Sequence, residues 1–437
     1  MVAIALDRDG FHLPAEVGSR GQTAFLRLCV RATAIGRLVD PFIEVSRGRT
    51  RYRQYFERGA TGQRHLNLSP IVGEADEALL ATRIQLRGSS ITWRRDAALE
   101  LFESPLVAGA RSLVLAPHPD DAEIAAFGLY SNRSSWVATI TAGDLGAPDL
   151  SAVLSPGPDV ARWSAILRVW DSLTIPRLGD VSDQRCVNLV YPDGRLKDMY
   201  DHPSRTAMLL CEEGLSRVTL RSHNGVPEFR GGDPGCTWIQ LVGELRLLLE
   251  KTNPDIVVCP HPLLDEHEDH IFATVALEEA VRGAARADRL FFLYVVHCRG
   301  APIHPFGPAD TWVSPSPWSG DDWVGDSIYS HPLAESVRVA KYFAIEAAHG
   351  LRTYSAGEPM TLGQVLRTVK GEAGAFLGGT GMPAASFLRR APRPNEIYYV
   401  VSSDSLSELV QRALGRRAAG ASIAGTKPRG SPRGGFA

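Results

Sequence analysis

Two short stretches of the chain are rich in side chains that bind metal ions or move protons. Residues 117–123 read PHPDDAE, and residues 261–270 read HPLLDEHEDH. A catalytic zinc ion takes about three nitrogen or oxygen ligands and keeps one position open for water. A nearby carboxylate then takes the proton of that water. Either stretch alone is also typical of polar caps at a strand end, but the two together favour a metal-dependent hydrolase.

The elements before these stretches predict that they meet in space. SLVLAP (112–117) and DIVVCP (255–260) are short apolar runs ended by proline, as in buried parallel strands. The carboxyl ends of parallel strands share one edge of an open α/β sheet, where sites form. His267 and His270 are three residues apart at a predicted helix start, so both imidazoles can face the same way.

Residues 106–405 alternate predicted strands with predicted helices. This alternation predicts an α/β fold with a Rossmann-like, mostly parallel sheet and helices on both faces. Strands are predicted at 112–117, 136–141, 255–260, 289–298 and 396–403. Helices are predicted at 122–131, 161–173, 237–252, 271–285, 335–352 and 360–378.

The two ends of the chain differ from this central part. Residues 1–105 contain short period-two runs broken by Gly, Asn and Pro, which predict a smaller all-β, sandwich-like domain. Its aromatic and arginine side chains could form a sugar-binding face or simply cover a sheet. Residues 406–437 predict a C-terminal helix and then a disordered tail rich in Gly, Pro and basic residues. The residues of the candidate face are Tyr52, Arg53, Tyr55, Phe56 and Trp93.

Composition narrows the class of protein. The 437 residues are 44% apolar and 22% charged with a net charge of −2, so no overall basic character argues for a nucleic-acid partner. The six cysteines lack CxxC spacing, which fits a reducing, cytoplasmic setting. No apolar run is long enough for a transmembrane segment. We expect a small-molecule, glycan or glycolipid substrate and leave open a peripheral membrane contact and the oligomeric state.

At these motifs the chain resembles the PIG-L deacetylase family, also called LmbE-like. The family has an AHPDD(E) signature after its first strand and an HxDH signature after a later one. Here they read PHPDDAE and HEDH, and TAGDLG (141–146) and YPDG (191–194) match secondary motifs in the expected order. The resemblance covers roughly residues 111–402 and leaves the β-rich N-terminal segment outside it.

The resemblance implies a role for each matching residue. His118, Asp121 and His270 match the zinc ligands of the family, although iron or another divalent metal also suits such ligands. Asp120 matches the general base. His267 matches the histidine that stabilises the oxyanion or protonates the leaving amine.

Four further residues are predicted around this core. Asp269 matches a carboxylate that supports the ligands from outside, and Asp193 lies where family members contact substrate hydroxyls. Arg162 stands at the family's Arg-x-x-Glu position, with Ala165 replacing the acid. His297, at the end of YVVHC, is a further candidate for substrate binding.

The implied activity is zinc-dependent removal of the acetyl group from an N-acetylated amino sugar. The extra β domain favours N-acetylglucosamine or N-acetylgalactosamine in a glycoconjugate or glycolipid precursor. The alternatives are an amidase acting on a thiol conjugate or another acyl-amino compound, and a non-catalytic carbohydrate-binding protein. Residues 198–237, rich in Gly, Pro and Arg, are expected to shape substrate choice.

Overall fold

The computed structural model describes most of the chain, and the predicted helix at 360–378 and most of the predicted tail lie outside the described residues. The described residues are 2–7, 9–14, 22–72, 83–145, 158–210, 215–232, 234–284, 286, 288–317, 325–351 and 385–418.

The N-terminal part consists of two four-stranded antiparallel sheets. One has the order β1-β8-β3-β6 and the other β2-β7-β4-β5. Alternate residues of both sheets point into a shared apolar core, for example Leu26 and Val30 from β3 and Val45 from β4. The predicted β-rich N-terminal region is thus present as two antiparallel sheets. The strands are β1 (Val2–Ala5), β2 (Gly10–Phe11), β3 (Gln22–Ala32), β4 (Phe42–Arg47), β5 (Thr50–Tyr55), β6 (Thr61–Asn67), β7 (Ile84–Ser89) and β8 (Ile91–Glu103), with the short helix α1 (Ser69–Val72) after β6.

The rest of the chain is built on a seven-stranded sheet of order β11-β10-β9-β12-β13-β15-β14. The first five strands are parallel, and β15 runs antiparallel to both of its neighbours, so the predicted mostly parallel sheet is confirmed. Two of the strands, β11 and β14, were not predicted. The strands are β9 (Ser112–Ala116), β10 (Ser135–Thr141), β11 (Cys186–Tyr191), β12 (Ile256–Pro260), β13 (Leu290–Tyr294), β14 (Ser327–Pro332) and β15 (Asn395–Val401).

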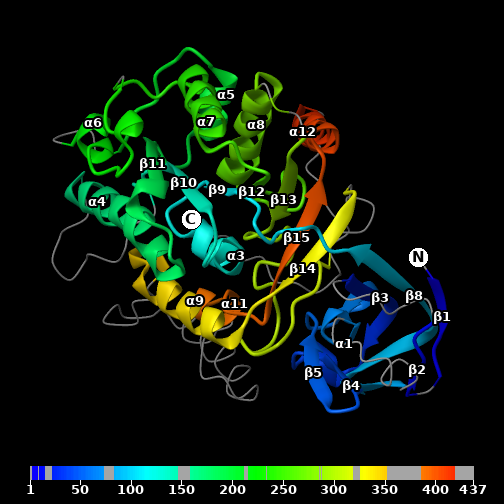
Figure 1. Cartoon of the computed structure of the whole chain (residues 1–437). Helices are drawn as coiled ribbons and strands as arrows, with labels where there is room; N and C mark the ends of the chain where they lie inside the picture. Colours follow the sequence, from blue (N-terminus) through cyan, green and yellow to red (C-terminus); the bar gives the residue numbers. More distant parts are fainter. Residues whose placement is uncertain are drawn as a thin grey trace.

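Helices cover both faces of this sheet (Figure 1). Leu113 and Leu115 of β9 pack in the core that includes α7, α8 and α12, whereas Val114 packs in the core that includes α3, α4 and α9. Because neighbouring residues of a strand face opposite sides, a strand covered on both faces must be apolar throughout. The helices are α3 (Asp121–Tyr130), α4 (Pro158–Thr174), α5 (Leu196–Asp201), α6 (Arg217–Arg221), α7 (Trp238–Thr252), α8 (Glu268–Arg282), α9 (Glu335–Ala347), α11 (Phe387–Arg390) and α12 (Ser403–Ala418).

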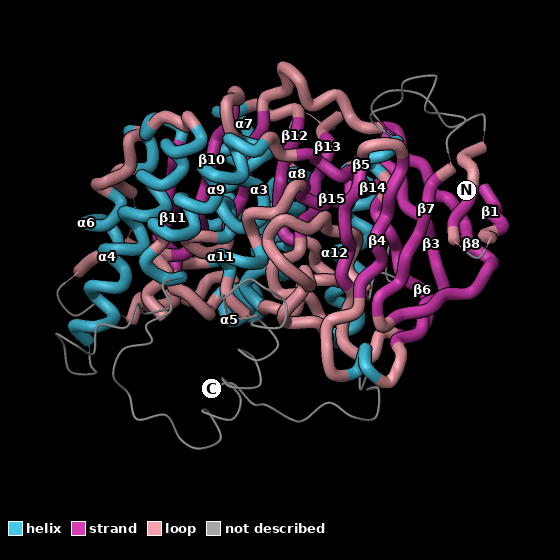
Figure 2. Tube along the Cα trace, turned by 90° about the horizontal axis from the view of Figure 1, so that it is seen from below, coloured by secondary structure: helices cyan, strands magenta, loops and turns pink. Residues whose placement is uncertain are grey.

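The N-terminal sheets lie beside the edge strand β14 (Figure 2). The buried Asn67 at the end of β6 donates hydrogen bonds to Ser330 Oγ in β14 (3.0 Å) and to the Val313 carbonyl (2.7 Å). The Ser330 amide donates to Thr23 Oγ1 in β3 (3.1 Å). These contacts cover a sheet edge that would otherwise be open to pairing with another chain.

No helix in the described ranges is long and apolar enough to cross a membrane.

Candidate metal centre

The first motif forms a tight turn between β9 and α3. The backbone amide of His118 donates to Asp121 Oδ2 (2.9 Å), which folds the Asp121 carboxylate back over the strand end. Asp120 precedes the helix with a φ of 140°, a sparsely populated value for a residue with a side chain. Such backbone strain is often found where function requires a special side-chain direction.

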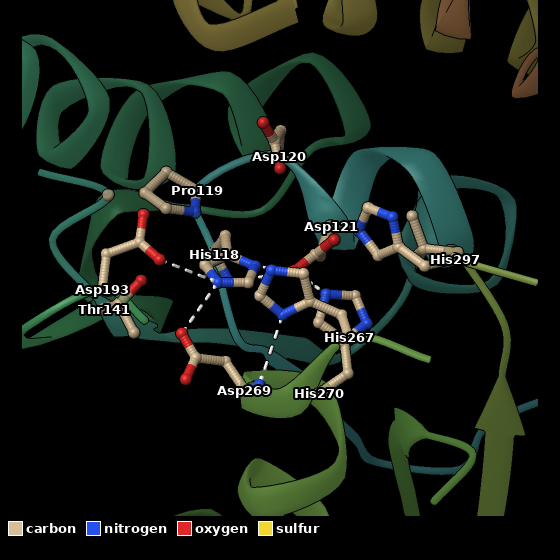
Figure 3. A network of polar contacts seen from close by, with 12 residues as sticks. His118, Pro119, Asp120, Asp121, Thr141, Asp193, His267, Asp269, His270 and His297 are labelled. Carbon is tan, nitrogen blue, oxygen red and sulfur yellow. Dashed lines mark hydrogen bonds and ion pairs between the residues drawn. The ribbon is translucent and has the colours of Figure 1, made fainter. Parts of the chain in front are cut away.

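Two of the predicted ligands, His118 and His270, approach the carboxylate of the third, Asp121 (Figure 3). Asp121 Oδ2 lies 3.2 Å from His118 Nδ1 and 3.1 Å from His270 Nε2. Ligand atoms about 2.0–2.2 Å from a tetrahedral zinc ion lie roughly 3.3–3.5 Å from each other, so these separations fit a shared metal ion. His270 Nε2 is buried, and its 3.1 Å contact with Asp121 Oδ2 lacks the geometry of a hydrogen bond. A ligand atom aimed at a metal ion would have this property.

Carboxylates hold the far sides of both imidazoles. His118 Nε2 lies 3.1 Å from Asp193 Oδ1 and 3.2 Å from Asp269 Oδ2, and His270 Nδ1 lies 3.0 Å from Asp265 Oδ2. Outer carboxylates of this kind fix the ring orientation of metal-binding histidines and raise their basicity. Asp269 also accepts the amides of Gly194 (2.6 Å) and Leu196 (3.1 Å), which holds the turn after β11 against the site.

The electrostatics of the cluster favour added positive charge. Burial alone lowers the pKa of His270, but Asp121 and Asp265 raise it to about 10. Burial likewise lowers the pKa of His118, and the hydrogen-bonded carboxylates raise it well above its usual value. Metal binding displaces protons from such histidines, so a divalent cation can supply the charge that the carboxylates attract.

Asp120 is turned away from this group and pairs with an arginine from α4. Its Oδ2 lies 3.1 Å from Arg168 Nη2, and the same nitrogen donates to the Pro119 carbonyl (3.3 Å). Burial raises the pKa of Asp120 to about 7, against the opposing effect of Arg168. A buried carboxylate of this pKa, next to the ligand group, has the properties of a general base. Gly350 lies directly over the pair, because a Cβ there would be 2.9 Å from Arg168 Nε and 3.3 Å from Asp120 Oδ2.

One ring nitrogen of His267 accepts a backbone hydrogen bond, and the other can donate a proton. His267 is the N-cap of α8, and its Nδ1 accepts the Asp269 amide (3.2 Å). In the neutral ring the proton must therefore sit on Nε2, which can donate to another group. Its ring centroid is 4.7 Å from that of His118. Burial and the neighbouring His118 and His270 lower the pKa of His267.

His297 also belongs to the cluster. Its ring centroid lies 4.8 Å from that of His270 and 5.1 Å from that of His267. With Asp121 and His270 it forms one of the groups whose ligand atoms lie within 4.8 Å of one another, so it could also take part in holding a metal. Burial and the nearby His270 lower its pKa to about 4.

The structure therefore brings together eight of the nine predicted site residues, and Arg162 is the exception. Arg162 lies on α4, and its buried Nε has no hydrogen-bond partner among the described residues. Arg168, two helical turns further along α4, contacts Asp120 instead. The eight residues are His118, Asp120, Asp121, Asp193, His267, Asp269, His270 and His297.

Three supporting residues were missed from the sequence. Asp265 lies within the quoted HPLLDEHEDH stretch, so its proximity to His270 was a usable signal. Asp144 lies in the TAGDLG stretch, and its Oδ1 accepts the Asp193 amide (3.0 Å). Arg168 had no local signal, because it is one of several charged residues on an amphipathic helix.

An α/β fold with a histidine and aspartate cluster at the carboxyl edge of its sheet defines the class of a candidate metallohydrolase. Residues 113–281 match the PIG-L family model, described as GlcNAc-PI de-N-acetylase. Both motifs lie within this matched segment.

Solved structures with some likeness to this chain were also found, whereas no curated protein matched it. A zinc-inhibited teicoplanin deacetylase is 18% identical, with a TM-score of 0.33, and the match covers 67% of this chain and 99% of that one. An antimicrobial pseudoaglycone deacetylase is 14% identical, with a TM-score of 0.34, covering 68% and 98%. A 4-carboxy-2-hydroxymuconate hydratase from Pseudomonas putida is 12% identical, with a TM-score of 0.34, covering 67% and 95%. Likenesses of this size carry no information about activity.

Proposed function

We propose that this protein hydrolyses the acetamide of an N-acetylated amino sugar and releases acetate. The observation that carries the proposal is the convergence of His118 Nδ1 and His270 Nε2 on Asp121 Oδ2, with the buried Asp120 as the adjacent residue of the same turn. The PIG-L match over residues 113–281 supports an amino-sugar amide as the substrate class.

We propose zinc as the metal, held by His118, Asp121 and His270. Two imidazoles and one carboxylate are a common ligand set for catalytic zinc, and iron(II) suits the same set. The buried, unbonded His270 Nε2 fits either ion. When bound, such a metal lowers the pKa of a water molecule and polarises the amide carbonyl.

The protein side chains supply the proton transfers. Asp120 takes a proton from the attacking water, and Arg168 fixes its carboxylate in position. His267 carries its available proton on Nε2 and gives it to the departing amine, or donates to the developing oxyanion. Asp269 orients His118 through its carboxylate, and its backbone amide holds the His267 ring at the start of α8.

We assign residues 1–105 to an accessory β domain, residues 106–405 to the catalytic domain, and residues 406–437 to a C-terminal helix and tail. The N-terminal sheets cover the β14 edge, which places additional surface beside the catalytic domain. Such surface suits a glycoconjugate or glycolipid precursor better than a free sugar. Asp193 is engaged with His118 through Oδ1, so a substrate hydroxyl would be met by its other oxygen, which is 3.7 Å from Arg168 Nη1.

The test is acetate release from N-acetylglucosamine and N-acetylgalactosamine glycosides, compared with N-acyl thiol conjugates. We expect the sugar substrates to be preferred. Preference for the thiol conjugates would move the assignment to the alternative amidase, and absence of any turnover in metal-loaded protein would favour the carbohydrate-binding alternative.

Asp120→Asn provides the matched mechanistic test. We expect a loss in kcat of about 10²- to 10⁴-fold, because the amide cannot accept the proton of the water. Metal content measured by elemental analysis should stay unchanged, since Asp120 is not among the proposed ligands. A variant that keeps full turnover would remove Asp120 from this role.

A further inference from the structure

A second hollow lies at the same sheet edge as the metal centre, beside the ends of β13 and β15. Its walls include Ile124 of α3, Val296, Tyr399 of β15, Arg390 and Arg393. The cavity has a volume of about 90 Å³, which is enough for several water molecules or for a small polar substituent.

The hollow adjoins the candidate catalytic residues through the chain itself. Val296 directly precedes His297, and its amide donates to Asp265 Oδ2 (3.0 Å), the oxygen that also holds His270. On the other wall, Ile124 lies one helical turn after Asp121. A ligand group in this hollow would therefore contact residues that lie one position along the chain from His297 and one helical turn from Asp121.

The hollow is lined by buried guanidinium groups without acidic partners. Arg390 donates from Nε to the His304 carbonyl (2.9 Å) and from Nη2 to the Val296 carbonyl (3.1 Å). Arg393 donates to the carbonyls of Pro305 (3.0 Å) and Gly307 (2.9 Å). These contacts hold the loop in place, and the Arg390 guanidinium also lies 4.4 Å from the centroid of the Phe387 ring, but none of these named partners is an anion.

Within the described residues, no carboxylate forms an ion pair with Arg390 or Arg393, and Arg390 Nη1 makes no hydrogen bond. The nearby Lys341 is already neutralised by Glu396, with Nζ and Oε1 2.7 Å apart. Burial lowers the pKa of Arg390 to about 10, which reflects the cost of placing this charge away from water. An anion is the natural complement, because guanidinium groups bind carboxylates and phosphates with strong, directional hydrogen bonds.

We propose that this hollow, with Arg390 as its main donor, binds a phosphate or carboxylate group of the substrate. The inference rests on the proposed function in that the anion belongs to the molecule being deacetylated. It narrows the substrate to an amino sugar that carries an anionic substituent close to the acetamide.

The test is a calorimetric titration of the purified full-length protein with inorganic phosphate and, separately, with acetate. We expect phosphate to bind, and Arg390→Gln to weaken binding about tenfold or more through loss of charge-assisted hydrogen bonds. Arg338→Gln is the matched control, since Arg338 donates to the nearby Ala309 carbonyl but is not among the lining residues that the structure describes. Its affinity should stay within about twofold of the unmodified protein.

Two further arms make the result decisive. Titration after chelation separates the hollow from a metal ion, because binding in the hollow survives metal removal. Arg390→Lys keeps the charge but loses the planar set of guanidinium donors, so we expect an intermediate phosphate affinity. This variant replaces Arg390→Gln in the test if Arg390→Gln does not fold. Arg390-dependent binding of acetate but not of phosphate would identify the bound group as a carboxylate, whereas acetate binding that Arg390→Gln leaves unchanged would overturn the inference.

The binding readout is independent of turnover. Equal phosphate affinity in the unmodified protein and both Arg390 variants, or no binding at all, would overturn the inference and leave the proposed deacetylation intact. Arg390-dependent binding in a protein that releases no acetate would instead contradict the proposed function.

Discussion

Asp120 and Asp121 are adjacent in the chain, yet their carboxyl groups have opposite properties. Burial acts to raise the pKa of both carboxyl groups. For Asp121, the neighbouring His270 and His118 outweigh burial and hold the pKa well below its usual value. Burial raises the pKa of Asp120 to about 7, because the lowering effects of Arg168 and His118 do not offset it. Neighbouring carboxyls with pKa values pushed apart are typical of sites where one group stays ionised and another exchanges protons.

A residue-scale prediction concerns Asp265, whose Oδ2 orients His270 Nδ1. We expect Asp265→Asn to weaken metal affinity about 10- to 100-fold, because the ring loses its anionic partner while all three ligands remain. Competition with a chelator of known affinity measures the change.

Two further variants serve as the negative and the positive control for metal binding. His270→Ala should abolish metal binding, whereas His202→Ala, which changes an exposed histidine, should leave it unaltered. Metal affinity in Asp265→Asn equal to that of the unmodified protein would show that the Asp265 contact does not support the ligand.

At the scale of elements, one buried carboxylate joins three of them. Glu396 of β15 accepts the amides of Gly128 (2.8 Å) and Leu129 (3.1 Å) at the end of α3, and it pairs with Lys341 of α9. This network fixes α3, whose first residue is the proposed ligand Asp121. The position of the metal site therefore depends on an acid far away in the sequence.

We expect Glu396→Gln to lower the free energy of unfolding by about 3–5 kcal/mol, because it leaves the buried Lys341 charge without its partner. Burial raises the pKa of Glu396, but Lys341 and neighbouring groups lower it overall from 4.5. A lowered pKa in the folded state means that this stabilisation is present above about pH 4.5 and is lost as the pH falls further. Urea unfolding between pH 3 and 7 should show this loss in the unmodified protein and a smaller one in the variant.

The double variant Glu396→Gln, Lys341→Met is the control for this experiment. Removing both charges should recover much of the stability. A double variant as unstable as the single one would mean that the amide contacts to α3, and not the ion pair, dominate.

At the scale of the whole molecule, the N-terminal sheets and the catalytic sheet are joined by polar contacts. Asn67 is fully buried and bridges from β6 to Ser330 and to the Val313 carbonyl. The loop that contains Val313 also lines the anion-binding hollow. The N-terminal part therefore supports one wall of the proposed substrate subsite.

We expect Asn67→Ala to lower the free energy of unfolding by about 1–3 kcal/mol, since it leaves buried polar groups with fewer partners. Denaturant unfolding measures this, and Gln63→Ala, at an exposed position on the same strand, should change it by less than about 0.5 kcal/mol. An unchanged stability in Asn67→Ala would show that the interface does not depend on this bridge.

The amino-acid sequence by itself determined the strands that carry both motifs, the mostly parallel sheet and eight residues of the converging cluster. Apolar runs buried on both faces and closely spaced ligand residues are local signals, so they can be recognised from short stretches. Only the tertiary structure decided that Arg168 pairs with Asp120, and that Glu396 holds α3. It also brought Arg390 of α11 to the carbonyl of Val296, the residue before His297. Such contacts join residues tens to hundreds of positions apart, and their partners are set by how helices and strands pack, which no local pattern records.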